Sequence, residues 1–182
     1  LVSAVKKFAA ESGGTPLQWD LSCVKKLMNA GEQVTEDVCD EFLRLSGLET
    51  EVMQPAFGMA EVCTCMTYAN DYGTPGVSVH RILKSTLPNI VIADEQATES
   101  ETLQVIDLGA PSPGVEIRIT QGSSDKVLRE NQVGHLQIRG ACVMQGYHQN
   151  PEANAECFPG DGWFDSGDLG FIRNDRLVLT GR

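Results

Sequence analysis

The first half of the chain shows apolar residues at two different spacings. Val2, Val5 and Phe8 recur at helical spacing, and the Gly-Gly-Thr-Pro run at 13–16 predicts where that helix ends. The apolar residues within 24–30 predict a short buried strand. A helix followed closely by a strand is typical of an α/β layer.

A second helix is predicted between Thr35 and Gly47. Thr35 is suited to the N-cap position, and the acidic residues that follow it favour the positive end of a helix dipole. Val38, Phe42 and Leu43 share one face and are expected to pack inward. Gly47 is suited to end the helix, because glycine adopts the left-handed conformation without strain.

The pattern of apolar and polar residues changes along the rest of the chain. A strand over 51–56 follows the second helix, and the polar, acidic stretch 93–102 predicts a surface connector. Beyond it, apolar and polar residues alternate in 115–119, 135–139 and 176–180, which predicts three strands.

These patterns place a boundary near residue 105. The predicted fold class is α/β plus β, with a partial α/β subdomain over 1–105 and a small β-rich unit over 106–182. A chain of 182 residues has room for one domain or two small ones.

The composition narrows the classes of partner. The net charge of −11 is a poor match for nucleic acid or an anionic membrane surface, since both are bound through Lys and Arg. No apolar run approaches the roughly 20 residues of a membrane helix. We therefore expect a cytoplasmic protein without nucleic-acid binding or membrane insertion. The chain lacks an initiator Met and begins in mid-pattern, which predicts an internal fragment.

The cysteines predict neither zinc nor disulfides. Their spacing includes one Cys-x-Cys but no Cys-x-x-Cys pair, whereas a structural zinc site needs paired ligands at short spacing. We expect buried, reduced thiols, as is usual in the cytoplasm. The cysteines are Cys23, Cys39, Cys63, Cys65, Cys142 and Cys157.

Two segments of the first half combine residues that suit a nucleotide. The run 29–34 contains small residues that let the backbone approach a flat ligand, although a plain turn has the same composition. The run 55–61 offers Phe57 for stacking on a base and Glu61 for Mg²⁺, which prefers carboxylate oxygen. A core aromatic and a helix-start acid are the structural alternatives.

Two segments near the C-terminus could bind a sugar. Asp168 lies between glycines in 162–170, and its carboxylate accepts hydrogen bonds only, which suits the two donors of a vicinal diol. Arg182 could donate to the same sugar or to a phosphate. A Gly-rich turn and an exposed terminal charge are the alternatives.

The order of these segments resembles the adenylate-forming, or AMP-binding, superfamily. Its Tyr-Gly-x-Thr-Glu motif is matched by Phe57-Gly-Met-Ala-Glu61, and its Trp/Tyr-x-x-Thr-Gly-Asp-Leu motif by Trp163-Phe-Asp-Ser-Gly-Asp-Leu169. Between them 108–119, 134–140 and 146–153 match further motifs in family order. The resemblance is closest to fatty acyl-AMP ligases and to adenylation or loading domains of polyketide and nonribosomal peptide synthases.

The resemblance implies a fold and a set of roles. The fold is the C-terminal part of the family's large N-terminal domain, in which an α/β layer is followed by a distorted β-barrel. Glu61 would be the catalytic residue and the Mg²⁺ ligand. The residues implied to bind ATP are Ala30, Gly31 and Glu32 around the adenine and acyl pocket, Phe57 on adenine, Gly58, Met59 and Ala60 beside it, and Asp168 and Arg182 on the ribose.

One departure from the family motif concerns a phosphate contact. Ala60 replaces the usual Thr, whose hydroxyl contacts the α-phosphate, and this should weaken that contact by about 1 kcal/mol. Alanine at this position favours the acyl-AMP ligase subgroup.

The activity implied is the ATP-dependent conversion of a small carboxylic acid to an acyl-adenylate, followed by transfer to a carrier-protein phosphopantetheine. A free-standing acyl-CoA synthetase, with CoA as the acceptor, is one alternative, and a non-catalytic interaction domain with degenerate motifs is another. The family's phosphate loop should precede residue 1 and its lid lysine should follow Arg182. We therefore expect these 182 residues to be inactive alone.

Overall fold

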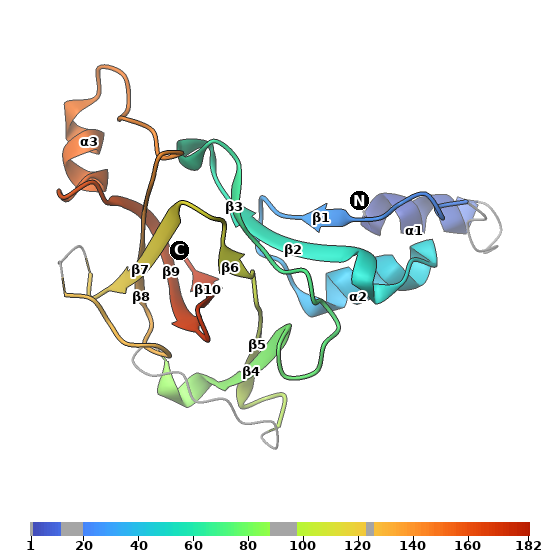
Figure 1. Cartoon of the computed structure of the whole chain (residues 1–182). Helices are drawn as coiled ribbons and strands as arrows, with labels where there is room; N and C mark the ends of the chain where they lie inside the picture. The colour runs from blue at the N-terminus through green and yellow to red at the C-terminus, as the bar shows by residue number, and fades with distance from the viewer. Residues whose placement is uncertain (1, 12–19, 88–97, 123–125) are drawn as a thin grey trace.

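The structure is a computed structural model that describes residues 2–11, 20–87, 98–122 and 126–182. The predicted helix end at 13–16 and the first part of the predicted connector at 93–97 lie outside these residues. Figure 1 shows a helical side built mainly on strands from the first half and a β-rich side built on strands from the second half.

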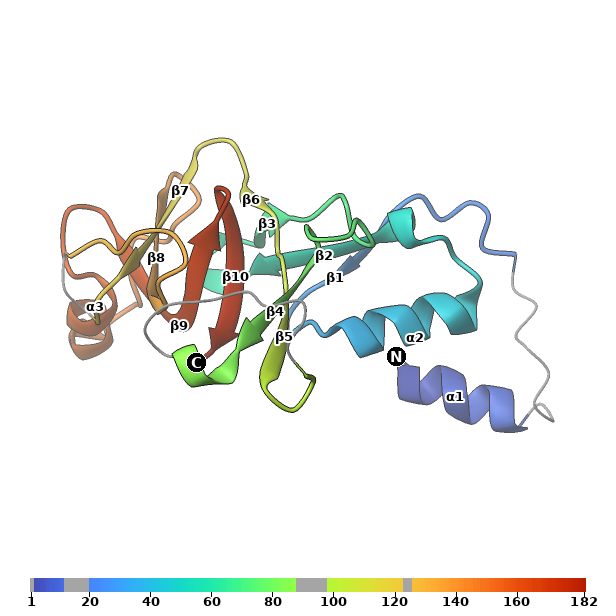
Figure 2. The same cartoon turned by 90° about the horizontal axis from the view of Figure 1, so that it is seen from below.

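The helical side is a small sheet covered by two helices. Its strands are β1 (Leu27–Asn29), β2 (Met53–Gly58), β3 (Cys65–Tyr68) and β6 (Ala110–Pro111), in the order β1-β2-β3-β6. Only β1 and β2 pair in parallel, because helix α2 (Glu36–Ser46) carries the chain between them. Helix α1 (Val2–Glu11) lies beside α2 on the same side of this sheet (Figure 2). The predicted strands at 24–30 and 51–56 are thus confirmed as β1 and β2, with shifted ends. The prediction that the first of them is buried is wrong, because β1 is short and its central residue, Met28, is 53% exposed.

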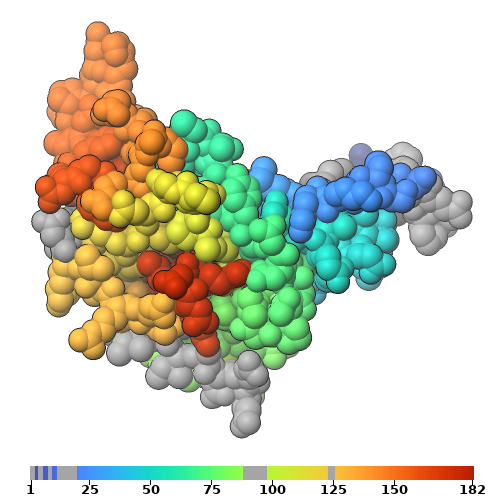
Figure 3. All heavy atoms as spheres, in the orientation of Figure 1, coloured from blue at the N-terminus to red at the C-terminus, as the bar shows by residue number. Residues whose placement is uncertain are grey.

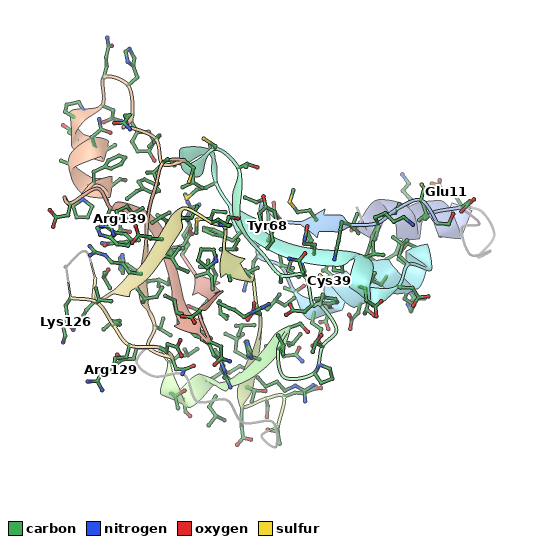
Figure 4. All side chains as sticks on the ribbon, viewed as in Figure 1. Glu11, Cys39, Tyr68, Lys126, Arg129 and Arg139 are labelled. Atoms are coloured by element: carbon green, nitrogen blue, oxygen red, sulfur yellow. The ribbon has the colours of Figure 1, made fainter. Side chains whose placement is uncertain are left out.

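Helix α2 begins and ends where its caps predict. Thr35 has an extended N-cap backbone, although its side chain makes no capping hydrogen bond. Gly47 ends the helix in the left-handed conformation, with its N–H donated to the Leu43 carbonyl. The predicted inward face is wrong at Val38, whose side chain is 47% exposed. Cys39 is fully buried instead and lies on α2 (Figure 4), because the helix turns its neighbouring position toward the sheet.

The β-rich side is a curled antiparallel sheet. Its strands are β7 (Val115–Thr120), β8 (Gly134–Gly140), β9 (Phe164–Arg173) and β10 (Arg176–Gly181), in the order β10-β9-β8-β7. The strands predicted at 115–119, 135–139 and 176–180 are confirmed. A short helix, α3 (Pro151–Cys157), lies between β8 and β9 in sequence.

A separate hairpin and three short turns complete the described chain. The hairpin pairs β4 (Val79–Leu83) with β5 (Thr102–Ile106). The single-turn 3₁₀ helices are η1 (Thr50–Val52), η2 (Ala60–Val62) and η3 (Lys84–Thr86). The predicted boundary near residue 105 stays a prediction.

Strand β10 joins the apolar clusters of the two sides. Leu177 belongs to the cluster inside the β7–β10 sheet, whereas Val178 packs in the cluster beneath the β4–β5 hairpin. Leu179 contacts the cluster under β2 as well as the first cluster. Figure 3 shows the C-terminal segment, in red, flanked on this face by residues from earlier in the chain.

A partly buried ion pair network ties β10 to two acids upstream in the chain. The Arg176 guanidinium donates to the Asp107 carboxylate, with Nε and Oδ1 2.7 Å apart, and to the Asp71 carboxylate, with Nη2 and Oδ1 2.7 Å apart. Asp107 is 1% exposed and also accepts a hydrogen bond from the Gly109 N–H. Since a buried carboxylate is costly without partners, these bonds fix where β10 docks.

The cysteines are all free thiols, but the prediction that they are buried holds only for Cys39. Cys23 and Cys63 are exposed, because each lies in a turn rather than in a strand or helix that packs on a core. In the described parts of the chain no helix is long and apolar enough to span a bilayer.

Candidate functional site

A cleft of about 500 Å³ lies between strand β2, the turn after β1, the middle of β9 and the C-terminal end of β10. The predicted site residues that line it are Gly31, Glu32, Phe57, Gly58, Met59, Asp168 and Arg182. Its lining also includes Leu108, which begins the matched run 108–119, and Leu179 of β10, and neither was assigned a role. The cleft therefore joins segments more than a hundred residues apart.

Three predicted residues lie beside the cleft rather than on its lining. Ala30 immediately precedes the lining residue Gly31, and Ala60 and Glu61 immediately follow Met59 in the η2 turn. Ala60 is exposed and Glu61 is half-buried.

Close backbone packing shapes the β2 wall of the cleft. A Cβ atom on Gly58 would come within 2.1 Å of the Thr64 carbonyl oxygen, so only glycine fits between β2 and β3 here. The next N–H, that of Met59, donates to the same Thr64 carbonyl at 3.2 Å. This contact turns the chain out of β2 and into η2, which carries Glu61.

The Glu61 carboxylate is held by a residue from the far half of the chain. The Tyr147 hydroxyl donates to Glu61 Oε1 at 2.9 Å, and the Met144 N–H donates to the Glu61 carbonyl at 2.8 Å. Burial, reinforced by the bond to Glu61, raises the pKa of Tyr147 to about 12. The hydroxyl therefore keeps its proton at neutral pH and remains a donor. The motif 146–153 contains Tyr147, but nothing in its spacing pointed to Glu61.

The second wall carries Asp168 on strand β9. The Asp168 N–H donates to Ser166 Oγ at 3.1 Å, and that hydroxyl donates to the Leu136 carbonyl of β8 at 3.0 Å. Gly167 between them has a left-handed backbone, with φ of 73°. Strand β9 is thus bent locally so that the 8% exposed Asp168 still reaches the cleft.

The electrostatics of Asp168 reflect both its burial and its neighbours. Burial raises the pKa of the Asp168 carboxyl, while Arg182 and the hydrogen bond from Ser166 act in the opposite direction. Arg182 Nε lies 3.2 Å from Asp168 Oδ1, and its side chain is 73% exposed. The negative charge of Asp165 and, to a smaller extent, that of Glu61 also raise the pKa of Asp168.

This arrangement suits a nucleotide with a bound divalent cation. Phe57 offers an aromatic face, and Asp168 is an acceptor for two hydroxyl donors. Among the described residues no three His, Cys, Asp or Glu side chains gather to form a metal site by themselves. Mg²⁺ does not need such a cage, since one or two carboxylates together with substrate phosphates and water commonly complete its shell. Glu61 therefore fits a Mg²⁺ ion that arrives with ATP.

Comparison with known proteins decides the family. The sequence model described as AMP-binding enzyme matches residues 2–148, most of the chain. The chain belongs to the AMP-binding enzyme family. This confirms the resemblance found in the motifs.

The AMP-binding chain is similar to several curated fungal enzymes. It is 31% identical over 171 residues to the nonribosomal peptide synthetase apvA of Aspergillus terreus. The aligned region covers 92% of this chain and 16% of that protein. It is 30% identical over 168 residues to the microperfuranone synthase of Emericella nidulans, covering 90% and 16%. The chain thus spans about a sixth of the length of the curated relatives it matches.

Solved structures confirm the fold class. The adenylation domain of a keto acid-selecting nonribosomal peptide synthetase module, bound to a keto acyl adenylate, is 35% identical with a TM-score of 0.89 and covers 100% of this chain and 33% of that one. The fatty acyl-adenylate ligases of E. coli and L. pneumophila give 25% identity and a TM-score of 0.78 over 91% of this chain and 30% of theirs. The mixed α/β sheet and the curled sheet are therefore part of the family's adenylation fold.

Proposed function

We propose that this AMP-binding chain binds ATP and Mg²⁺ for the activation of a carboxylic acid as an acyl-adenylate. The single observation that carries the proposal is a cleft whose lining includes both Phe57 and Asp168, with Glu61 in the η2 turn just beyond the lining residue Met59. Its dimensions support the proposal, since 500 Å³ falls within the usual range for small-molecule sites.

The reaction is an in-line displacement at phosphorus. A carboxylate oxygen of the acid attacks the α-phosphorus of ATP, the bond from that phosphorus to the bridging oxygen breaks, and pyrophosphate leaves. Mg²⁺, when bound with ATP, neutralises charge on the phosphate oxygens. The protein contributes mainly by positioning its substrates, which lowers the entropic part of the barrier.

The predicted site residues have distinct roles in that positioning. Phe57 stacks on adenine, with Gly31 and Glu32 at the border of the adenine and acyl pocket. Asp168 accepts hydrogen bonds from both ribose hydroxyls, and Arg182 donates to the same sugar. Glu61 would hold the Mg²⁺ that arrives with ATP. We assign it as the catalytic residue of the set, because it would touch the metal of the reacting nucleotide.

The second step transfers the acyl group from AMP to a thiol. We assign the acceptor to a carrier-protein phosphopantetheine, because the curated relatives of at least 30% identity include nonribosomal peptide synthetases. A free-standing CoA-dependent enzyme is the alternative. Thioester formation by the full-length protein, offered holo-carrier protein and CoA separately, distinguishes the two acceptors. The identity of the acid, the cytoplasmic location and the inactivity of the 182 residues alone stay predictions.

Nucleotide affinity of the full-length protein tests the proposal. Asp168→Asn keeps the shape of the side chain but removes its charge, so the two charge-assisted hydrogen bonds to the ribose weaken. We expect AMP and ATP to bind roughly 10- to 100-fold more weakly in a calorimetric titration.

The matched control is Asp175→Asn in the β9–β10 turn. Asp175 is exposed and has a φ of 60°, a conformation that asparagine also tolerates. This variant should bind nucleotide as the wild type does. Equal affinities for the Asp168 variant and the wild type would favour the non-catalytic interaction domain.

A further inference from the structure

The turn that carries Glu61 is fastened to a segment far along the chain at three points. The Glu61 carbonyl accepts a hydrogen bond from the Met144 N–H at 2.8 Å, and the Glu61 carboxylate accepts one from the Tyr147 hydroxyl at 2.9 Å. The Cys63 thiol lies 3.4 Å from the Cys142 carbonyl oxygen. Segment 142–147 therefore constrains both the backbone and the side chain of Glu61.

Tyr147 is itself held in place by the helix that follows. The Tyr147 N–H donates to Asn154 Oδ1, and Asn154 Nδ2 donates to the Tyr147 carbonyl at 2.9 Å, so one amide side chain binds both backbone polar groups of Tyr147. Gly146 leaves room for this contact, because a Cβ atom there would come within 3.0 Å of Asn154 Oδ1. Asn150 caps the same helix, accepting from the Ala153 N–H.

We propose that Tyr147 is a positioning residue for Glu61, which holds the carboxylate in the orientation that receives the Mg²⁺ of bound ATP. The inference rests on the function proposed above. Within the described residues, Tyr147 is the side chain that donates a hydrogen bond to this carboxylate, and it engages one oxygen. The other oxygen, Oε2, has no hydrogen-bond partner among those residues and remains able to ligate a metal.

The need for such a residue follows from the small number of protein ligands. A glutamate side chain has several rotamers, so fixing it in one of them costs conformational entropy. Where a single carboxylate holds the metal, the cost falls on metal binding unless the protein fixes the rotamer beforehand. Hydrogen bonds to ligating carboxylates serve this purpose, and their loss typically weakens metal binding roughly 10- to 100-fold.

The full-length protein with a non-hydrolysable ATP analogue provides the test. Binding of Mn²⁺ to the protein–analogue complex is followed by electron paramagnetic resonance, and binding of the analogue without metal is measured in EDTA. Tyr147→Phe removes only the hydroxyl. We expect roughly 10-fold weaker Mn²⁺ binding and unchanged metal-free nucleotide binding.

A matched control separates this role from the general loss of a tyrosine hydroxyl. Tyr68, labelled in Figure 4, is half-buried on β3 and donates to the Cys65 carbonyl at 3.0 Å, outside the cleft. Tyr68→Phe should leave both affinities at the wild-type value. Equal losses of Mn²⁺ affinity in the two variants would overturn the proposal.

A double-mutant comparison tests whether Tyr147 acts through Glu61. In a Glu61→Ala background, Tyr147→Phe should cause no further loss of Mn²⁺ affinity, whereas an effect that persists there contradicts the inference. If Tyr147→Phe does not fold, Asn154→Asp decides the question, because it removes the donor to the Tyr147 carbonyl and leaves the hydroxyl intact. Several-fold weaker Mn²⁺ binding is expected, and wild-type binding would refute the proposal.

The two proposals fail in different ways. A wild-type protein that binds no nucleotide contradicts the proposed function and, with it, the role of Tyr147. A wild-type protein that binds nucleotide and Mn²⁺ normally, together with a Tyr147→Phe variant that does the same, contradicts only the positioning role.

Discussion

The two walls of the cleft hold their carboxylates in different ways. Asp168 is supported by its own neighbours, Ser166 and Gly167, and by the adjacent strand β8. Glu61 depends on Tyr147, which is 86 residues away in sequence. Local sequence therefore determines the geometry of one wall, whereas the geometry of the other exists only once the two sides of the molecule have packed together.

The largest expected effect is a loss of stability when a glycine of each wall is replaced by alanine. Gly58→Ala should lower the free energy of unfolding by about 3 kcal/mol or more, because the added Cβ meets backbone atoms of Thr64 and Cys65 that cannot move aside. Gly167→Ala should cost about 1–2 kcal/mol, since nothing lies within 4 Å and only the left-handed backbone is strained.

Urea unfolding of both variants measures this difference. Gly181→Ala is the control, because a Cβ there meets nothing within 4 Å and the backbone is not left-handed, so its stability should match that of the wild type. If the Gly58 variant is as stable as the Gly181 variant, the backbone around Gly58 can move to accept a Cβ atom, and the prediction is wrong.

A smaller effect is expected when the β2 wall regains the hydroxyl typical of its family. Ala60 is exposed, so Ala60→Thr introduces no clash. If the hydroxyl contacts the α-phosphate, ATP should bind about fivefold more tightly, the equivalent of about 1 kcal/mol. Calorimetry with Ala141→Thr, an exposed turn position outside the cleft lining, provides the comparison. Equal affinities in the two variants would mean that position 60 makes no phosphate contact.

The smallest effect concerns the stability of the Asp168 wall without nucleotide. Burial raises the pKa of Asp168, so the folded protein binds this proton more tightly than the unfolded chain does. Stability then falls as the pH rises from the ordinary value of 3.8 through the raised pKa, and Asp168 costs stability at neutral pH. Asp168→Asn should therefore be slightly more stable than the wild type at pH 7, with the difference closing under acid conditions.

Thermal unfolding at several pH values follows this change. A variant that is less stable at pH 7, or whose advantage grows on acidification, would show that the contacts with Arg182 and Ser166 outweigh the burial of the carboxylate. Combined with the expected loss of nucleotide affinity, the predicted result describes a residue kept for binding at the expense of stability.

The elements that the sequence predicted are those with regular alternation or clear caps. Helix α2 between Thr35 and Gly47 and strands β7 and β8 follow directly from such local signals. No strand was predicted over β9, and a Gly-rich turn was one alternative for 162–170, because Gly, Asp and Ser are depleted in strands. Tertiary pairing with β8 and β10 overrides that preference.

The sequence predicted those residues of the candidate site that lie within short motifs, and it did not predict contacts between distant segments. Phe57, Gly58 and Asp168 were found from motif order and do line one cleft. Tyr147 could not be found, because a hydrogen bond between residues 86 positions apart leaves no periodic or compositional trace. The β3 strand and the β4–β5 hairpin were missed for a related reason, since these short strands lack an unambiguous alternation.

The docking of β10 has a consequence for recombining this chain with a relative. Leu177, Val178 and Leu179 are consecutive, yet they enter clusters formed by different parts of the chain, and Arg176 pairs with two acids far upstream. A chimaera with a crossover between residues 107 and 176 would place the last strand of one parent against the carboxylates and apolar surfaces of another. Its designer has to transplant Asp71 and Asp107 together with that strand, although they lie far upstream.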